Sequence, residues 1–358
     1  MRILIFAVAV AAAAALAAQA QEPGTLTTLR EIHALTKAEA RGGLAVAFEA
    51  TVTYYNRSDV DLFVQDDGDA IYVETKQNQE LTSGDRVLVR GKTRDSFTPD
   101  VLSDSVTLLH HGDPPKPVAV DFEQLIRAQR DCMLVTVSAK MRSADTVTFG
   151  GVHGIYLKLL MDGGYVDATV AGSDARKLRE LLDADVEVIG VVSGKFDSKM
   201  QLIGILLEVP TLADIKVLKR AAVSPNSLPI TPMDQVLPSS YLHDLTRRVR
   251  VKGTITYYQP GSAVVLQDGD KSLWISTNAS DPMRIGDIAE ATGFPDGRSG
   301  FLELTDGEIQ DRNIFAPIQP QPSTWRQLAT WNSGDPDGHQ NDLVSFEGQV
   351  AAAMREDS

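Results

Sequence analysis

The chain contains an internal repeat. The block Ala50-Thr51-Val52-Thr53-Tyr54-Tyr55 recurs as Gly253-Thr254-Ile255-Thr256-Tyr257-Tyr258. Val64-Gln65-Asp66 then recurs as Leu266-Gln267-Asp268, and Gly84-Asp85 recurs as Gly286-Asp287, in the same order and at nearly the same spacing. Repeats of this kind are typical of chains built from copies of one supersecondary unit. The sequence therefore predicts an array of small β-modules, which favours binding or display over catalysis.

The N-terminus reads as a secretory signal peptide, residues 1–20. Arg2 is followed by an alanine-rich apolar run, Ile3 to Ala17, and by the small-residue cleavage pattern Ala18-Gln19-Ala20. The alternative is an uncleaved anchor, but the run is shorter than the ~20 apolar residues that a membrane span needs. We expect cleavage near Ala20 and a periplasmic or extracellular chain. Any membrane attachment would then come from a segment that this sequence does not contain.

Charge and cysteine content narrow the partners. The formal net charge is −14, so the chain has no electrostatic attraction to phosphate backbones, and the sequence predicts no nucleic-acid partner. Cys132 is the single cysteine, which rules out an internal disulfide. It stands beside Met133 and Leu134, and we expect a buried, unreactive thiol.

The first module resembles an OB-fold barrel. Residues 21–44 are predicted to form a lead-in helix, and residues 45–117 alternate apolar and polar side chains in five short segments separated by Asp-Gly and Gly-Asp turns. Five short strands in this length, with a long first strand, are typical of the OB fold. The predicted fold class is mainly β, with tandem OB-like five-stranded barrels joined by short helices and proline-rich linkers.

Three further segments follow the same plan. Residues 118–222 form a divergent second module with a helix over 174–182, and residues 223–318 form a third. Residues 319–358 read as a linker helix and the first strand of an incomplete fourth module, because Leu343 to Val350 matches the start of the third. A lone strand cannot close a barrel, so we expect a fragment of a longer polypeptide.

No catalytic constellation is visible in the sequence. It has no phosphate-binding glycine loop, no G-x-S-x-G elbow and no H-E-x-x-H pair. Asp66 to Asp69 and Asp268-Gly269-Asp270 read as hairpin turns rather than calcium loops. We therefore predict no catalytic residue, no metal and no cofactor; an exported hydrolase is the weakest alternative.

Aromatic residues supply the candidate binding site. If the apolar positions of the first three strands face the barrel interior, simple alternation sends Tyr55, Phe63 and Tyr72 outward, and sends Tyr258 and Trp274 outward in the third module. OB folds bind ligands on this face. The functional interpretation is a stacking platform for a small molecule, a glycan or an envelope protein. The alternative is that the rings pack against a linker helix or a neighbouring module.

Residues 47–55 (AFEATVTYY), 62–66 (LFVQD) and 84–97 (GDRVLVRGKTRDSF), with the lead-in 26–43, resemble a known kind of region. They are similar to the periplasmic OB-like repeats of bacterial sensor histidine kinases and diguanylate cyclases, notably of acidobacteria. The resemblance implies an extracytoplasmic sensory region of a membrane-bound signalling protein, with catalysis in a cytoplasmic part that is absent from this sequence. It supplies no ligand residues and leaves the output type open.

The predicted function is thus a sensory or binding region, of the histidine kinase type first. A ligand or partner protein would bind the aromatic face or a crevice between modules and change their relative orientation. Homodimerisation is expected if a kinase follows. The alternative is a free-standing envelope protein that binds a ligand or another protein.

Overall fold

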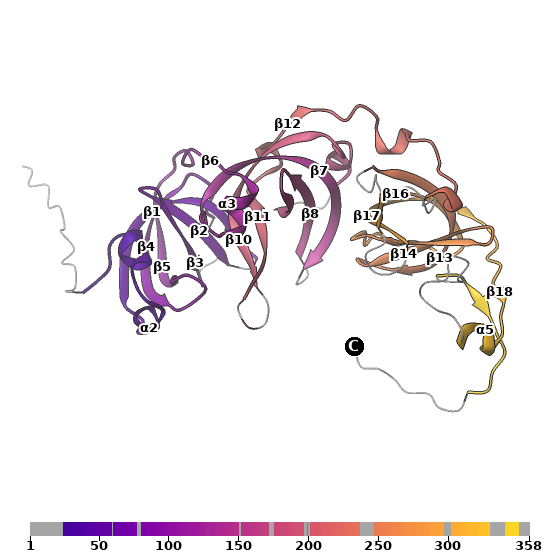
Figure 1. The fold of residues 1–358 in the computed structure, drawn as a ribbon. Helices are drawn as coiled ribbons and strands as arrows, with labels where there is room; N and C mark the ends of the chain where they lie inside the picture. The colour runs from indigo at the N-terminus through magenta and orange to yellow at the C-terminus, as the bar shows by residue number, and fades with distance from the viewer. Residues whose placement is uncertain are drawn as a thin grey trace, which may run out of the picture.

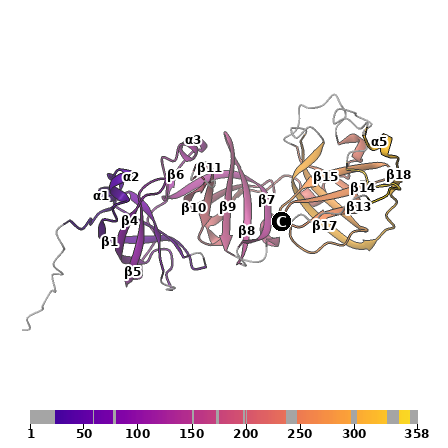
Figure 2. The same cartoon turned by 90° about the horizontal axis from the view of Figure 1, so that it is seen from below.

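Three β-barrels follow one another along the chain in a row (Figure 1). The structure is a computed structural model that describes residues 24–58, 60–76, 80–149, 152–171, 175–196, 199, 201–236, 247–296, 302–329 and 341–350. The predicted signal peptide, residues 1–20, lies outside the described residues. A view from below keeps the three barrels in the same line (Figure 2).

The first barrel closes in the strand order β1-β2-β3-β5-β4. Its strands are β1 (Ala45–Asn56), β2 (Asp61–Asp66), β3 (Asp69–Glu74), β4 (Arg86–Arg94) and β5 (Asp100–His110). All pairings are antiparallel except β3 with β5, which run parallel. A closed five-stranded Greek-key barrel of this order is the OB fold, so the predicted fold class is confirmed.

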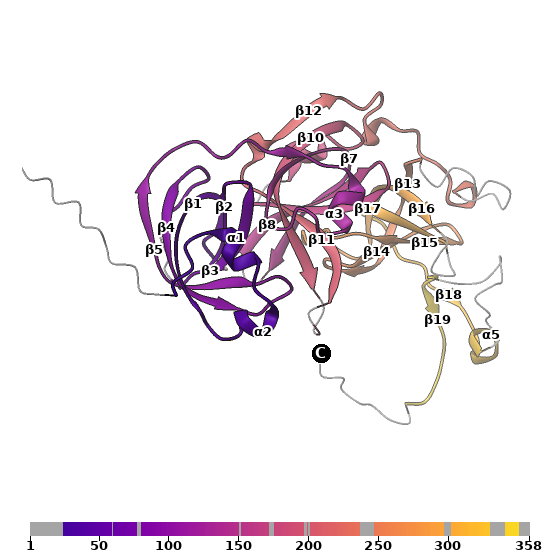
Figure 3. The same cartoon turned by 60° about the vertical axis from the view of Figure 1, so that its left-hand side comes forward.

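The lead-in is two short helices, where the sequence predicted one. They are α1 (Leu29–His33) and α2 (Lys37–Ala40). Thr28 and Thr36 each cap a helix in a reciprocal capping box with the glutamate three residues later, and the second box starts a new helix. Leu29 and Ile32 join the core of the first barrel, and α1 lies against that barrel (Figure 3).

The second barrel is a larger version of the same plan. Its barrel strands are β7 (Leu134–Phe149), β8 (Val152–Met161), β9 (Gly164–Ala171), β10 (Asp185–Phe196) and β11 (Leu202–Val209). Pairing of β10 with β7 closes it, and β6 (Val118–Ala119) and β12 (Ile215–Lys219) extend the sheet. Short helices flank it: α3 (Phe122–Ile126), α4 (Arg176–Arg179) and η1 (Leu212–Asp214). The predicted helix over 174–182 is thus limited to α4 in the described residues.

The third barrel repeats the strand order of the first. Its strands are β13 (Val249–Gln259), β14 (Ala263–Asp268), β15 (Lys271–Ser276), β16 (Asp287–Asp296) and β17 (Glu303–Phe315), preceded by η2 (Pro225–Ser227) and η3 (Met233–Gln235). Beyond it lie β18 (Gln321–Pro322), α5 (Trp325–Ala329) and β19 (Val344–Ser345). The strand predicted over Leu343 to Val350 is therefore limited to the two residues of β19.

Each segment of the repeat also contains a short parallel bridge to its first strand. Leu26 pairs with Val46, and Ile230 pairs with Arg250. In the same way β6 pairs parallel with β7, and β18 pairs parallel with β19. The repeat therefore begins before the barrel, with a bridging residue or short strand and then a short helix. Strand alternation alone does not reveal this part of the repeat.

The two junctions between barrels differ in chemistry. Phe63 and Ala70 of the first barrel belong to the buried core cluster of the second, so this junction is apolar. The second and third barrels meet through ion pairs, with the Arg248 side chain 2 % exposed and its Nε 2.9 Å from Asp183. In the part of the chain that the structure describes, no helix combines the length and apolar character that crossing a membrane requires.

Candidate functional site

A β-bulge decides which tyrosine of the first repeat faces outward. Val52 pairs with Val64, but the next pair is Tyr54 with Phe63, so Thr53 is an extra residue in β1. The Thr53 hydroxyl donates to the Phe63 carbonyl at 3.1 Å. Beyond the bulge the alternation is reversed, and Tyr55 packs against the core cluster of its own barrel. The prediction that Tyr55 shares the outer face with Phe63 and Tyr72 is therefore wrong, because simple alternation ignores the inserted residue. Tyr55 lies near the end of β1, where it lines the cleft described below, and its role in binding stays a prediction.

The third barrel has the same bulge. Ile255 pairs with Leu266 and then Tyr257 pairs with Val265, which leaves Thr256 as the extra residue. Tyr258 packs against the core, and its hydroxyl donates to the Asp281 carbonyl at 2.6 Å, so its predicted outward position is also wrong. Tyr257 instead stacks on Trp274, with ring centroids 5.7 Å apart and planes at 26°.

The outer faces of these two barrels have different surroundings. Phe63 lies between Tyr54 and Tyr72 in edge-to-face contacts with centroids 6.1 and 5.3 Å apart. Phe63 is only 5 % exposed and belongs to the core cluster of the second barrel. Phe63 and Tyr72 therefore pack against the neighbouring barrel, which was the alternative to a ligand-binding surface. In the third barrel Tyr257 is 41 % exposed, and a binding role for Trp274 stays a prediction.

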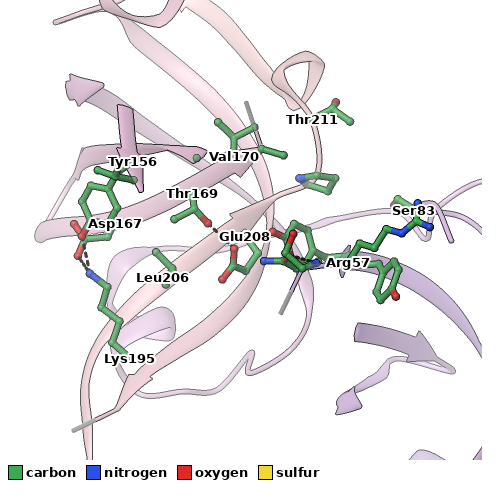
Figure 4. Close-up of a pocket in the computed structure, with 18 of the residues that line it drawn as sticks. Arg57, Ser83, Tyr156, Asp167, Thr169, Val170, Lys195, Leu206, Glu208 and Thr211 are labelled. Atoms are coloured by element: carbon green, nitrogen blue, oxygen red, sulfur yellow. Dashed lines mark hydrogen bonds and ion pairs between the residues drawn. The ribbon is translucent and has the colours of Figure 1, made fainter. Parts of the chain in front are cut away.

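A large hollow lies where the three barrels approach one another. Its volume is about 1120 Å³, and we call it the inter-barrel cleft. The first barrel contributes the end of β1 and the loop before β4, the second contributes the outer face of β8 and β9 with β10 and β11, and the third contributes Asn278. Figure 4 shows Tyr156, Asp167 and Lys195 grouped on one wall, with Arg57 and Ser83 on the opposite side.

A lysine, a carboxylate and a phenol form the centre of that wall. Lys195 Nζ forms an ion pair with Asp167 and donates to the Tyr156 hydroxyl oxygen at 2.6 Å. It also lies 5.0 Å from the centroid of the Tyr156 ring. Burial, followed by the hydrogen bond with Asp167 and its charge, raises the pKa of Tyr156. The phenol therefore stays neutral at physiological pH, as a hydrogen-bonding group rather than a base.

Two further contacts fix the polar groups of the cleft. The Thr169 hydroxyl donates to Glu208 at 2.5 Å across β9 and β11, as Figure 4 marks. Lys158 Nζ lies 2.6 Å from Asp306 of the third barrel, which ties two barrels together at the edge of the cleft. The wall thus offers donors, acceptors and an aromatic ring in a fixed arrangement, which suits recognition of a polar ligand.

Sequence reasoning missed this wall because the second module diverges from the repeat. The signal was present in the alternation of β8 and β9, where Tyr156, Lys158, Asp167 and Thr169 face one side. These positions correspond to the outer face on which Phe63, Tyr72 and Trp274 lie in the first and third barrels.

Beside the cleft, two carboxyl groups are buried together at the junction of the second and third barrels. Glu308 Oε1 accepts from the backbone N–H of Ala144 at 3.3 Å. Burial and the neighbouring Asp145 charge raise the pKa of Glu308 to about 8, although Arg179 opposes the shift. Burial likewise raises the pKa of Asp145. In the described ranges, no group of three or more His, Cys, Asp and Glu residues is arranged to hold a metal ion.

Comparisons with known proteins identify no family. No family model matches the sequence, and no curated protein matches it. Among solved structures, a replication protein A heterotrimer bound to ssDNA is 10 % identical over 80 % of this chain and 96 % of that chain, with a TM-score of 0.24. A murine DNA-binding protein bound with dsDNA is 13 % identical over 48 % of this chain and 98 % of that chain, with a TM-score of 0.26.

A chain described as an aspartyl-tRNA synthetase from Leishmania major Friedlin is 14 % identical over 36 % of this chain, with a TM-score of 0.24; the match spans 25 % of that chain. At these TM-scores the similarities identify no function. They do correct one prediction, the exclusion of nucleic acid as a partner. Two of these similar chains were solved with DNA bound, so net charge alone does not exclude that class of partner.

Proposed function

We propose that this chain is the extracytoplasmic ligand-sensing region of a membrane-bound signalling protein of the histidine kinase or diguanylate cyclase type. The observation that supports the proposal is the inter-barrel cleft, which takes lining residues from all three barrels. A ligand in it contacts more than one barrel, so its binding free energy depends on how the barrels are oriented. Binding then favours one orientation, which is the thermodynamic requirement for a sensor.

The chemistry of the cleft supports a small polar ligand. Its volume is slightly above the range of about 300–1,000 Å³ that small-molecule sites occupy. Lys195, Asp167 and Glu208 carry charges of both signs, and Tyr156 adds a ring face. This combination suits a glycan or a peptide, each of which presents alternating donors and acceptors beside an apolar face.

The test measures the distance between barrels while ligand candidates are added. Spin labels are placed at Thr107→Cys in β5 and Lys271→Cys in β15, both exposed, in a Cys132→Ser background. Neutral disaccharides and dipeptides are the probes. Double electron–electron resonance spectroscopy measures the distribution of distances between the two spin labels. We expect a probe that binds to shift or narrow this distribution, and Lys195→Met to abolish the shift.

A probe that binds in the cleft and leaves the distances unchanged would contradict the sensor and leave a simple binding protein. Arg312→Met is the control, because Arg312 pairs with Glu290 within the third barrel and away from the cleft. Export is tested separately by sequencing the N-terminus of the protein from the periplasm, where we expect the chain to start at Gln21.

A further inference from the structure

A second, smaller cavity lies between the first and second barrels. Its volume is about 330 Å³, and we call it the junction cavity. Phe63, Tyr72 and Phe97 supply rings from the first barrel, and Asp131, Cys132 and Ser193 line the side of the second barrel. An occupant would therefore touch both barrels at once.

The lining of the junction cavity is strongly negative. Four carboxylates line it, those of Asp61, Asp100, Asp131 and Glu208, together with one guanidinium, that of Arg94. Arg94 already makes two hydrogen bonds to Asp100, at 2.8 and 3.0 Å, and an ion pair with Glu74. Its positive charge is therefore committed to two carboxylates and does not offset the others.

Hydroxyl groups donate to two of the other acids in the lining. The Tyr72 hydroxyl donates to Asp61 at 2.5 Å, and the Thr98 hydroxyl donates to Asp131 at 3.1 Å. Burial raises the pKa of the Asp131 carboxyl, which His33 and the hydrogen bond from Thr98 only partly oppose. A bound cation would offset this cost of burial and stabilise the ionised form of Asp131.

The walls select the kind of cation. Phe63 and Tyr72 meet edge to face, and the Lys37 ammonium lies 6.0 Å from the centroid of Phe97 on the lead-in side. Ring faces attract alkylammonium groups, whereas a divalent metal requires a shell of oxygen ligands. Among the described residues no such metal-binding group exists. Rings together with carboxylates in a cavity of this size suit an organic cation.

We propose that the junction cavity binds a small organic ammonium ion. Its charge is offset by Asp131 and Asp61, and its alkyl groups contact Phe63 and Tyr72. Because the site joins two barrels, an occupant stabilises the apolar junction between them. The proposal concerns a different cavity from the inter-barrel cleft and stands without the sensor function.

The test is isothermal titration calorimetry of residues 21–358 with tetramethylammonium chloride and with 1,4-diaminobutane, at constant ionic strength. The neutral isostere of the first probe, neopentyl alcohol, is titrated in parallel. We expect saturable binding of at least one cation and at least tenfold weaker binding of the isostere. Asp131→Asn and Tyr72→Leu are each expected to weaken cation binding at least tenfold, while Asp104→Asn, at an exposed position of β5 outside the cavity, leaves it unchanged.

A second readout keeps the proposal falsifiable if a variant folds poorly. In the unsubstituted chain, a saturating concentration of the cation is expected to raise the midpoint of thermal unfolding, and the same concentration of neopentyl alcohol is not, because a ligand that binds only the native state stabilises it. Absence of saturable binding up to 20 mM of either cation would overturn the proposal. So would equal binding of the isostere, or cation binding that Asp131→Asn leaves intact.

Discussion

Arg179 Nε in the second barrel lies 3.1 Å from Oε2 of Glu308 in the third barrel. The Glu308 side chain is only 11 % exposed, and the Asp145 carboxyl shares the same buried region. Asp306 and Arg248 also act on this pair, as the second barrel and the third barrel meet here. The junction therefore holds two acids against one close guanidinium, and its stability depends on pH.

Stability of this junction is expected to fall as pH rises. Burial raises the pKa of Glu308 to about 8 in the native structure, well above the value of about 4.3 for an exposed glutamate. The native state therefore binds more protons than the unfolded state between these values. The contribution is fully present below about pH 4.3 and is lost as pH rises through about 8, with a slope of at most about 1.4 kcal/mol per pH unit.

The measurement is urea unfolding of the third barrel from pH 5 to 9, followed by tryptophan fluorescence. All three tryptophans, Trp274, Trp325 and Trp331, belong to the third barrel or to the sequence after it. Glu308→Gln keeps a carbonyl acceptor for the Ala144 N–H and removes the titration, so we expect a flatter profile. An unchanged slope in this variant would show that another group titrates.

Arg248→Met is expected to destabilise the pairing of the second and third barrels. The Arg248 guanidinium donates to Asp183 and to the backbone carbonyl of Arg142, and it lies 4.5 Å from the Phe294 ring centroid. Removing the guanidinium leaves the partly buried Asp183 carboxylate with Arg142 as its remaining ion-pair partner in the described part of the chain. We expect the free energy of unfolding to fall by roughly 3–5 kcal/mol. Arg30→Met is the control: Arg30 pairs with Asp69 at 3.5 Å, but its side chain is 76 % exposed. In urea unfolding, Arg30→Met should change the free energy of unfolding by less than about 1 kcal/mol.

Tyr54→Ala and Tyr257→Ala test the two equivalent outer faces. Tyr54 packs against the core cluster of the second barrel, whereas Tyr257 is 41 % exposed. We expect Tyr54→Ala to weaken the junction of the first two barrels by roughly 1–3 kcal/mol, and Tyr257→Ala to leave it unchanged. Limited proteolysis of the linker at residues 111–117 reports the junction, and equal cleavage of both variants would contradict the assignment.

Gly253→Ala is expected to destabilise the third barrel, although alanine occupies the equivalent position 50 of the first. A Cβ at Gly253 would lie 2.7 Å from the backbone oxygen of Gln267 and 2.9 Å from Met233 Cε. Overpacking of this kind costs roughly 1–3 kcal/mol. Differential scanning calorimetry measures the loss. Gly204→Ala is the control, because Gly204 also lies in a strand without a positive φ and the nearest atom to its Cβ would be Lys195 Cδ at 3.6 Å.

The Cys132 thiol is expected to be unreactive in the native chain. Burial raises the pKa of the thiol well above its ordinary value, and the neighbouring Asp131 charge adds to the shift. Little thiolate is then present at neutral pH, and thiolate is the reactive form. Labelling with Ellman's reagent should be at least tenfold faster in 6 M urea than in buffer, and fast labelling of the folded chain would disprove the assignment.

The barrels were predictable because their strands carry a strong local signal. Apolar alternation in β1 and matched turns in the repeats specify strand positions without knowledge of the tertiary structure. Strand β7 extends past its apolar first half as far as Phe149. The extension includes Arg142, Ser143 and Asp145, which are buried and interrupt the apolar pattern. Arg142 pairs with Asp183 of its own barrel and lies 4.5 Å from the ring centroid of Phe294 in the third barrel, and Asp145 accepts from Asn278 of the third barrel. Alternation in one strand cannot reveal such contacts.

The candidate site was less predictable for two physical reasons. The inter-barrel cleft depends on how barrels approach one another, which no local pattern encodes. The outer aromatic face depended on strand phase, and Thr53 and Thr256 reverse that phase. The partner strands have no such bulge, so the outer face holds the predicted residues Phe63, Tyr72 and Trp274. Tyr55 and Tyr258 follow the bulge in β1 and β13, and they face the barrel core instead.

The bulge at Thr53 and at Thr256 places two adjacent tyrosines in opposite environments. Tyr54 and Tyr257 meet what lies outside the barrel, while Tyr55 and Tyr258 serve its interior. Loss of the single codon for Thr53 would remove the bulge and keep the pairing of Val52, Tyr54 and Tyr55 in the same order, so Tyr54 would stay outward and Tyr55 inward. In a duplicated gene of this design, the bulge therefore accommodates an insertion or deletion of three nucleotides in the first strand, while the flanking tyrosines keep their environments.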